Sequence, residues 1–215
     1  PVGTSRWDLS DKELFSRFAS PGTEVDVVSL DSGPTSIESR YDVVLVESLV
    51  IDKVLRFWKG YNAVIVNCFL DPAVDALREV IGVPVVGPCE ASLAIASTLG
   101  RVAAVVTVNR SVAKAVEDRI NMLPLKHLVK GVSSIDVRVE EMEKDMELII
   151  SKLVNEVNKL VKDVNAEVVI LGCTGFGGLA DRIMRDTKVP VVDPVAASIK
   201  VAEALASLKL RHSKL

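Results

Sequence analysis

Short apolar runs of Val, Ile and Ala alternate along the chain with longer stretches in which apolar residues recur at helical spacing. The apolar runs are continuous, whereas a strand with one face in water would alternate apolar and polar residues. Continuous runs are typical of parallel strands that helices cover on both faces. We expect strands at residues 24–29, 63–67, 84–86, 101–107, 167–171 and 190–192, with a further strand near 127–132.

Helix boundaries follow from capping residues. Asp71-Pro72 and Asp193-Pro194 each predict a helix start, because aspartate caps the first turn and proline fits its first position. Gly60 and Gly100 stand where two helical patterns end. The predicted helices span residues 8–19, 43–59, 72–81, 91–99, 112–121, 139–164, 178–185 and 196–208.

This alternation predicts an α/β fold of three layers (αβα), with helices on both sides of parallel sheets. One pattern also occurs twice: an apolar run ending in cysteine, a Gly/Pro/Asp loop, an amphipathic stretch, PVV and a second helix. PVVGPCEAS in the first unit matches PVVDPVAAS in the second. We therefore expect two pseudo-symmetric lobes, residues 1–99 and 100–193, with an active site in the cleft between them. The last helix, 194–210, should pack back on the first lobe.

The start of the chain is unusual for this pattern. Pro1-Val2-Gly3-Thr4 resembles a loop that follows a strand. A sheet of this kind is built on a central first strand, so we expect a short apolar segment upstream of Pro1.

The repeat places Cys68 and Cys173 at equivalent positions, each at the end of a buried strand. Ligands of open α/β sheets bind at this edge, where helix N-termini and loop amides favour a thiolate. Two thiols that face each other across a cleft can act as one acid and one base on opposite faces of a substrate. A lone cysteine is often only a small buried hydrophobe, but two at repeat-equivalent strand ends favour a functional pair.

Other residues near these strand ends are candidates for substrate binding. Thr174 and Gly175 follow the second cysteine, where free backbone N–H groups can point at an oxyanion. Thr107 ends a strand and Glu90 begins a helix, and each also has an ordinary structural explanation. Cys89 has no counterpart in the repeat, where Val195 stands, so we expect a structural role for it.

Composition excludes several classes of protein. A net charge of -3 and the lack of a basic cluster with interleaved aromatic residues argue against nucleic-acid binding. No apolar run is long enough to span a membrane, and no signal peptide is evident. Three cysteines argue against a secreted disulfide framework and for the cytoplasm. His127 and His212 lie in no metal-ligand motif, so we expect no metal.

The segments NCFLDP with PVVGPCEA, and LGCTGFGGLA with VPVVDPVAAS, resemble the two signature regions of the Asp/Glu/hydantoin racemase superfamily, most closely its hydantoin racemase branch. The resemblance covers nearly the whole chain. It implies two flavodoxin-like lobes and a two-base enzyme without cofactor, whose catalytic thiols map onto Cys68 and Cys173. The family's N-terminal substrate loop maps onto Pro1 to Thr4, with Gly3 in place of an asparagine.

Departures from the amino-acid racemases of this superfamily bear on the substrate. Phe69-Leu70 follows Cys68 where those enzymes have Asn-Thr, and Gly175-Phe176 occupies the region of their histidine. An apolar surround without a charged clamp suits a neutral ring better than a free amino-acid carboxylate.

The leading hypothesis is a homo-oligomeric racemase that inverts C5 of 5-substituted hydantoins or related cyclic ureides, with a small-molecule substrate as its partner. Backbone amides and the hydroxyls of Thr4, Thr107 and Thr174 would hold the ring. The alternatives are an aspartate or glutamate racemase, a maleate isomerase-like enzyme, and a non-catalytic ligand-binding or thiol-redox protein on the same fold.

Overall fold

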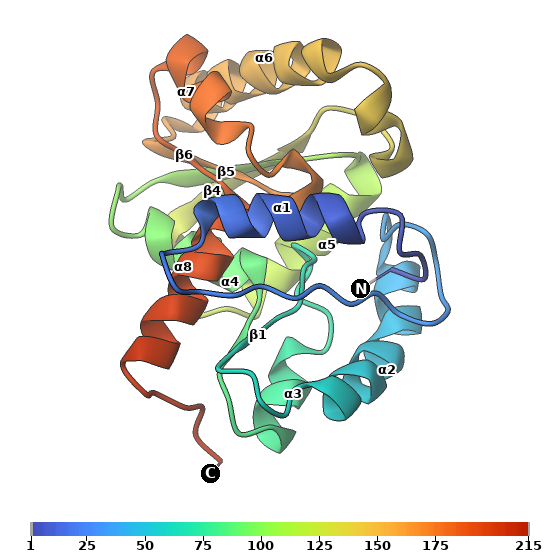
Figure 1. Ribbon diagram of the computed structural model, residues 1–215. Helices are drawn as coiled ribbons and strands as arrows, with labels where there is room; N and C mark the ends of the chain where they lie inside the picture. The colour runs from blue at the N-terminus through green and yellow to red at the C-terminus, as the bar shows by residue number, and fades with distance from the viewer. Residues whose placement is uncertain (1, 215) are drawn as a thin grey trace.

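The computed structural model describes residues 2–214 and shows an α/β fold with two parallel sheets, as predicted (Figure 1). The larger sheet has the strand order β4-β3-β5-β6, and the smaller one pairs β1 with β2. Strand bounds are Val64–Ile65 for β1, Val85–Val86 for β2, Ala103–Thr107 for β3, Val129–Ser134 for β4, Val168–Leu171 for β5 and Val191–Val192 for β6.

Helices cover both faces of the larger sheet and complete the three layers. In Figure 1, α6 and α7 lie on one face, and α4, α5 and α8 lie on the other. Helix bounds are Asp8–Phe18 for α1, Arg40–Phe57 for α2, Val74–Val80 for α3, Pro88–Ala96 for α4, Arg110–Asn121 for α5, Met146–Val164 for α6, Ala180–Thr187 for α7 and Pro194–Ser207 for α8, with short 3-10 helices at Lys126–Leu128 (η1), Val139–Lys144 (η2) and Thr174–Phe176 (η3).

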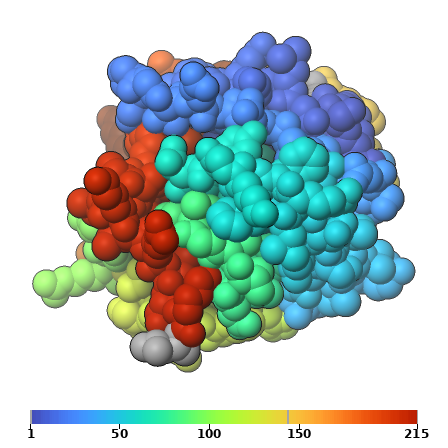
Figure 2. All heavy atoms as spheres, turned by 60° about the horizontal axis from the view of Figure 1, so that its bottom comes forward, coloured from blue at the N-terminus to red at the C-terminus, as the bar shows by residue number. Residues whose placement is uncertain are grey.

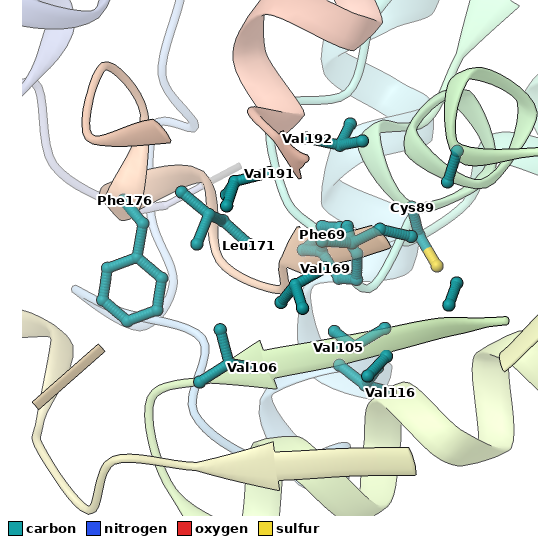
Figure 3. Packing of buried hydrophobic residues seen from close by; sticks show 14 of the residues in the cluster. Phe69, Cys89, Val105, Val106, Val116, Val169, Leu171, Phe176, Val191 and Val192 are labelled. Atoms are coloured by element: carbon teal, nitrogen blue, oxygen red, sulfur yellow. The ribbon is translucent and has the colours of Figure 1, made fainter. Parts of the chain in front are cut away.

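The core of the larger sheet follows from its continuous apolar strands. Every residue of β3 and β5 is buried, and Val105 of β3 pairs with Val132 on one side and Ile170 on the other. Burial of each such side chain stabilises the fold by about 1.5–3 kcal/mol. Figure 3 shows part of this cluster, in which Phe69 and Cys89 lie with strand residues such as Val169 and Val192.

The first half of the chain has a smaller core of its own, built around Val46, Val74, Leu77 and Val85. Helix α8 packs against α4 and α1 and also contacts β1 and β2. The chain after α8 then lies along the α3–β2 region (Figure 2), where His212 Nε2 accepts a hydrogen bond of 2.8 Å from the Val85 amide.

Two predicted elements differ from the structure. Residues 24–29 are extended but form no strand among the described residues, because they face a cavity and not a neighbouring strand. The helix predicted at 139–164 is divided into η2 and α6 at Asp145, whose side chain accepts the Leu148 amide at 3.0 Å and caps α6.

The predicted helix start at Asp71-Pro72 is also wrong. Helix α3 begins at Val74, after Ala73 with a φ of 61°, and Asp71 itself has a φ of 49°. The Asp71 carboxylate accepts the amides of Cys89 and Glu90 instead, at the start of α4. Asp193 caps its own helix as expected and accepts the amides of Val195 and Ala196.

Candidate active site

A cavity of about 1510 Å³ is lined by residues from both halves of the chain, and Cys68 and Cys173 both line it. It exceeds the roughly 300–1,000 Å³ of ordinary ligand pockets. Its lining extends beyond the two cysteine turns to residues 22–30 and 57–67. The part beside the thiols lies at the carboxyl ends of β1 and β5, the edge where ligands of open parallel sheets bind.

Cys68 lies just after β1 in a tight turn. Its carbonyl accepts the Asp71 amide at 3.0 Å, and its own amide donates to Val66 at 2.6 Å. The thiol is partly buried, and the Leu70 backbone amide hydrogen-bonds to its sulfur. The turn therefore presents the sulfur to the cavity and gives it one amide donor.

Cys173 follows β5 and precedes η3, in a second turn of the same kind. Its carbonyl accepts the Phe176 amide at 3.0 Å. The amides of Gly175 and Phe176 hydrogen-bond to its sulfur. A side chain at position 175 would collide with the terminal methyl of Met142, so the flexible end of Met142 would have to move aside.

Both thiols are protonated at neutral pH. Burial raises the pKa of Cys68 to about 11, against the lowering effect of the Leu70 amide. Burial, with smaller contributions from the nearby Cys68 and Glu38, raises the pKa of Cys173 to about 12 against the lowering effect of its two amides. The charge on Cys68 thus contributes to the raised pKa of Cys173, and both cysteines are free of disulfide bonds.

The described residues offer no group of three or more His, Cys, Asp or Glu side chains that could hold a metal ion. Within the same part of the chain, no helix is long and apolar enough to cross a membrane. The two cysteine turns themselves bring two thiols to the cavity, together with the backbone amides of Leu70, Gly175 and Phe176 that bond to their sulfurs.

Comparisons with known proteins agree with this arrangement. The family model described as Asp/Glu/Hydantoin racemase matches residues 11–202. A hydantoin racemase from Pseudomonas sp. (strain NS671) is 36% identical over 90% of this chain and 78% of its own. The crystal structure of an allantoin racemase from Pseudomonas fluorescens superposes with a TM-score of 0.95 at 31% identity, over 100% of this chain and 91% of that one.

The chain belongs to the Asp/Glu/hydantoin racemase family. It is an enzyme of the racemase type. An allantoin racemase from Klebsiella pneumoniae is also similar, with a TM-score of 0.89 at 26% identity, over 99% of this chain and 88% of that one. The resemblance inferred from the two cysteine motifs and the predicted α/β class are both confirmed.

Three of the predicted substrate-binding residues of this racemase line the cavity: Phe69, Thr174 and Gly175. Phe69 is almost fully buried, so it forms part of the floor beside Cys68. Thr174 and Gly175 follow Cys173 directly, with the Gly175 amide turned to the sulfur.

Four other predicted residues are not among those that line the cavity. Thr107 is fully buried, and its hydroxyl donates to the Gly172 carbonyl at 2.7 Å. Phe176 is buried in the core near Leu171 (Figure 3). Glu90 forms an ion pair of 2.7 Å with Arg78, and Thr4 Oγ1 accepts the Arg6 amide at 3.2 Å.

The structure thus places these four outside the cavity lining, and their expected roles in substrate binding stay predictions. Pro1 lies outside the described residues. Cys89 is fully buried in the core of this racemase, as Figure 3 shows.

Sequence reasoning did not anticipate several lining residues of the racemase. Asn67 donates to Asp11 of α1 at 2.9 Å, and burial raises the pKa of that carboxyl group. Ile37 and Met142 add apolar surface from the loop before α2 and from η2. These residues meet only through contacts between distant segments, so no local pattern could have identified them, although Asn67 adjoins a cysteine.

Proposed function

We propose that this racemase inverts the C5 stereocentre of a 5-substituted hydantoin or a related cyclic ureide, with Cys68 and Cys173 as its two proton-transfer groups. The observation that carries the proposal is that both cysteines line one cavity, each from a tight turn that follows a parallel strand. The names of the similar proteins, hydantoin racemase and allantoin racemase, support this class of small-molecule substrate.

The reaction needs one thiolate and one thiol. The thiolate removes the C5 proton, and the electron pair moves into the adjacent ring carbonyl to form an enolate. The opposite thiol then gives its proton to the other face of C5, which leaves it as the thiolate. The ring carbonyls delocalise the charge, so the mechanism requires no cofactor, and backbone amides near Thr174 and Gly175 would stabilise the oxyanion.

Acidic amino acids fit the cavity less well. The loops that carry the cysteines contain no Arg or Lys to pair with a substrate carboxylate. Lysines that do line the cavity lie on or beside α2 and on α8, and two of them are engaged: Lys53 pairs with Asp31 at 2.7 Å and Lys200 with Glu203 at 2.9 Å. The carboxylate of an acidic amino acid would therefore lose its hydration on binding without gaining an ion pair with Arg or Lys.

A substrate panel tests the proposal. Isobutyl- and benzyl-hydantoin, allantoin, L-aspartate and L-glutamate are incubated with the enzyme and EDTA, and loss of optical rotation is followed against an enzyme-free blank. We expect turnover of the cyclic ureides and none of the free amino acids. Faster racemisation of aspartate or glutamate would overturn the substrate assignment.

Replacement of each thiol tests the mechanism. Cys68→Ser and Cys173→Ser should each lower racemisation at least 1,000-fold, because a serine hydroxyl is a far weaker base than a thiolate (roughly 4 kcal/mol of barrier). Cys89→Ser serves as the matched control and should retain most activity. Near-normal racemisation by either of the first two variants would exclude the two-thiol mechanism.

A further inference from the structure

Each cysteine turn is connected to the start of a helix by an aspartate carboxylate that the mechanism above does not use. In the first half, the Asp71 amide closes the turn onto the Cys68 carbonyl at 3.0 Å. The Asp71 carboxylate then accepts the amides of Cys89 at 3.0 Å and Glu90 at 3.2 Å, in the first turn of α4. Its side chain is completely buried and also contacts Arg119 Nε at 3.4 Å.

The second half contains a similar connection, but there the aspartate lies at the helix start and bonds to an amide of the cysteine loop. Asp193 begins α8, and its Oδ1 accepts the amides of Val195 at 2.9 Å and Ala196 at 3.1 Å. The other oxygen accepts the Gly178 amide at 2.5 Å. Gly178 ends the loop that begins at Cys173, so this carboxylate again joins a cysteine loop to a helix N-terminus.

The two aspartates occupy different positions in the repeat. Aligned on Cys68 and Cys173, whose carbonyls close equivalent turns, Asp71 corresponds to Phe176; aligned on Pro84 and Pro190, Gly87 corresponds to Asp193. A Cβ added to Gly87 would collide with the carboxyl group of Asp71, so this carboxyl group lies beside the position that corresponds to Asp193. In both halves, one carboxylate therefore connects the cysteine loop to the start of a helix. The loop supplies this carboxylate in the first half, and the helix start supplies it in the second half.

We propose that Asp71 and Asp193 are the positioning residues of Cys68 and Cys173, an inference that rests on the two-thiol function proposed above. Asp71 has a left-handed backbone (φ 49°), a conformation that is uncommon for residues other than glycine, although aspartate adopts it more often than most. The carboxylate bonds to α4 hold the turn in this conformation. Since a shift of about 1 Å in a reacting group lowers rates up to a hundredfold, these connections control proton transfer.

Asp71→Gly and Asp193→Ala test the assignment, because each removes one carboxylate and leaves both thiols. Glycine accepts the backbone angle at position 71. We expect kcat to fall about 10- to 100-fold in each variant, with KM changed less than threefold, since the ring still binds and only the thiol is misplaced. Circular dichroism and thermal melting confirm that the variants are folded.

Isotope effects separate positioning from a general structural defect. Cys68→Ser identifies the enantiomer that Cys68 deprotonates, because the C5 proton of that enantiomer no longer exchanges with solvent in this variant. In Asp71→Gly, the primary deuterium isotope effect at C5 should rise for this enantiomer and fall for its mirror image. Asp193→Ala should give the reverse. Equal isotope effects for the two enantiomers, unchanged from the parent enzyme, would overturn the proposal.

Relocation of the carboxylate gives a second test. The double variant Asp71→Gly/Gly87→Asp moves the carboxylate from the loop to the helix start, the arrangement of the second half, into the space that Asp71 leaves. We expect it to recover kcat to within about threefold of the parent. Gly87→Asp alone should be impaired by the collision with Asp71. A double variant no better than Asp71→Gly would refute the positioning role. If Asp71→Gly does not fold, the kcat and isotope effects of Asp193→Ala test the role in the second half.

The failure of this inference can be told from the failure of the proposed function. If Cys68→Ser and Cys173→Ser remain active, the two-thiol function is wrong. If both are inactive while Asp71→Gly and Asp193→Ala keep parental kcat and isotope effects, only the positioning role is wrong.

Discussion

At the scale of single residues, two opposing influences act on each sulfur. Loss of water on burial raises the pKa of both thiols, and backbone amides lower it without restoring the ordinary value. Burial is the larger influence, so Cys68 titrates at about 11 and Cys173 at about 12. The free enzyme therefore holds as neutral thiols the two cysteines that we propose as proton-transfer groups, and their thiolates are minor species near neutral pH.

A pH dependence follows from these raised pKa values. Below a pKa, the thiolate fraction grows about tenfold for each pH unit, so kcat/KM should rise about tenfold per unit between pH 7 and 9. Initial rates of optical-rotation change, corrected for spontaneous racemisation, measure this slope. A flat profile over the range would show that one thiol ionises below pH 7 and would contradict the assigned environment.

From sequence, Asp71 was predicted to cap the helix that directly follows it, whereas its carboxylate accepts the amides at the start of α4. Asp71-Pro72 and Asp193-Pro194 are the same dipeptide, and local capping rules treat them alike. Only the fold brings the amides of Cys89 and Glu90 within reach of Asp71. The two cysteines could be predicted to share a cleft because the repeat itself encodes their equivalence.

At the scale of elements, the loop before α2 holds the cavity wall formed by η2. Glu38 accepts the Asn109 side-chain amide at 3.0 Å and the Val139 backbone amide at 3.3 Å. Thr35 donates to Glu140 at 2.5 Å. These bonds join the first half of the chain to η2, which carries Met142 into the cavity beside Gly175.

Glu38→Ala should loosen this wall. Loss of the two amide bonds removes about 1–3 kcal/mol of interaction, and the substrate must then order the wall when it binds. We expect KM to rise about fivefold with a smaller change in kcat. Glu141→Ala is the matched control, since Glu141 is exposed and pairs with Lys144 at 3.7 Å within η2. An equal rise of KM in the control would contradict the role of Glu38.

The elements themselves were predictable to different degrees. The fully buried strands β3 and β5 were predicted closely, because continuous β-branched runs leave little choice of structure. The break before α6 was missed, because apolar residues keep helical spacing through Asp145. Residues 24–29 have strand composition but no partner strand among the described residues, and pairing depends on neighbours that local sequence does not reveal.

At the scale of the whole molecule, Arg119 links the two halves. This residue of α5 contacts Asp75 at 2.6 Å and Asp71 at 3.4 Å, both from the first half of the chain. Burial raises the pKa of Asp71 to about 7, and the Arg119 charge opposes that rise. The ion pair therefore supports the ionised form of a carboxylate that would otherwise be buried alone.

Arg119→Ala should lower the free energy of unfolding by about 3 kcal/mol at pH 8, because it leaves Asp71 buried without a cationic partner. The loss should shrink at pH 5, since Asp71 with its raised pKa is then protonated and needs no partner. Urea denaturation at the two pH values measures both. Lys114→Ala, from an exposed pair on the same helix, should cost at most about 0.5 kcal/mol, and a similar loss for both variants would contradict the argument.

The neutral state of the two buried thiols has a consequence for the chemical durability of the enzyme. Alkylating agents and peroxides attack thiolates, which is why redox-sensing cysteines have lowered pKa values. A thiol that titrates at about 11 should react with iodoacetamide at pH 7.5 about twentyfold more slowly than free cysteine, since its scarcer thiolate is only partly offset by higher nucleophilicity. A cell under oxidative stress would therefore lose sensor cysteines well before it lost this racemase.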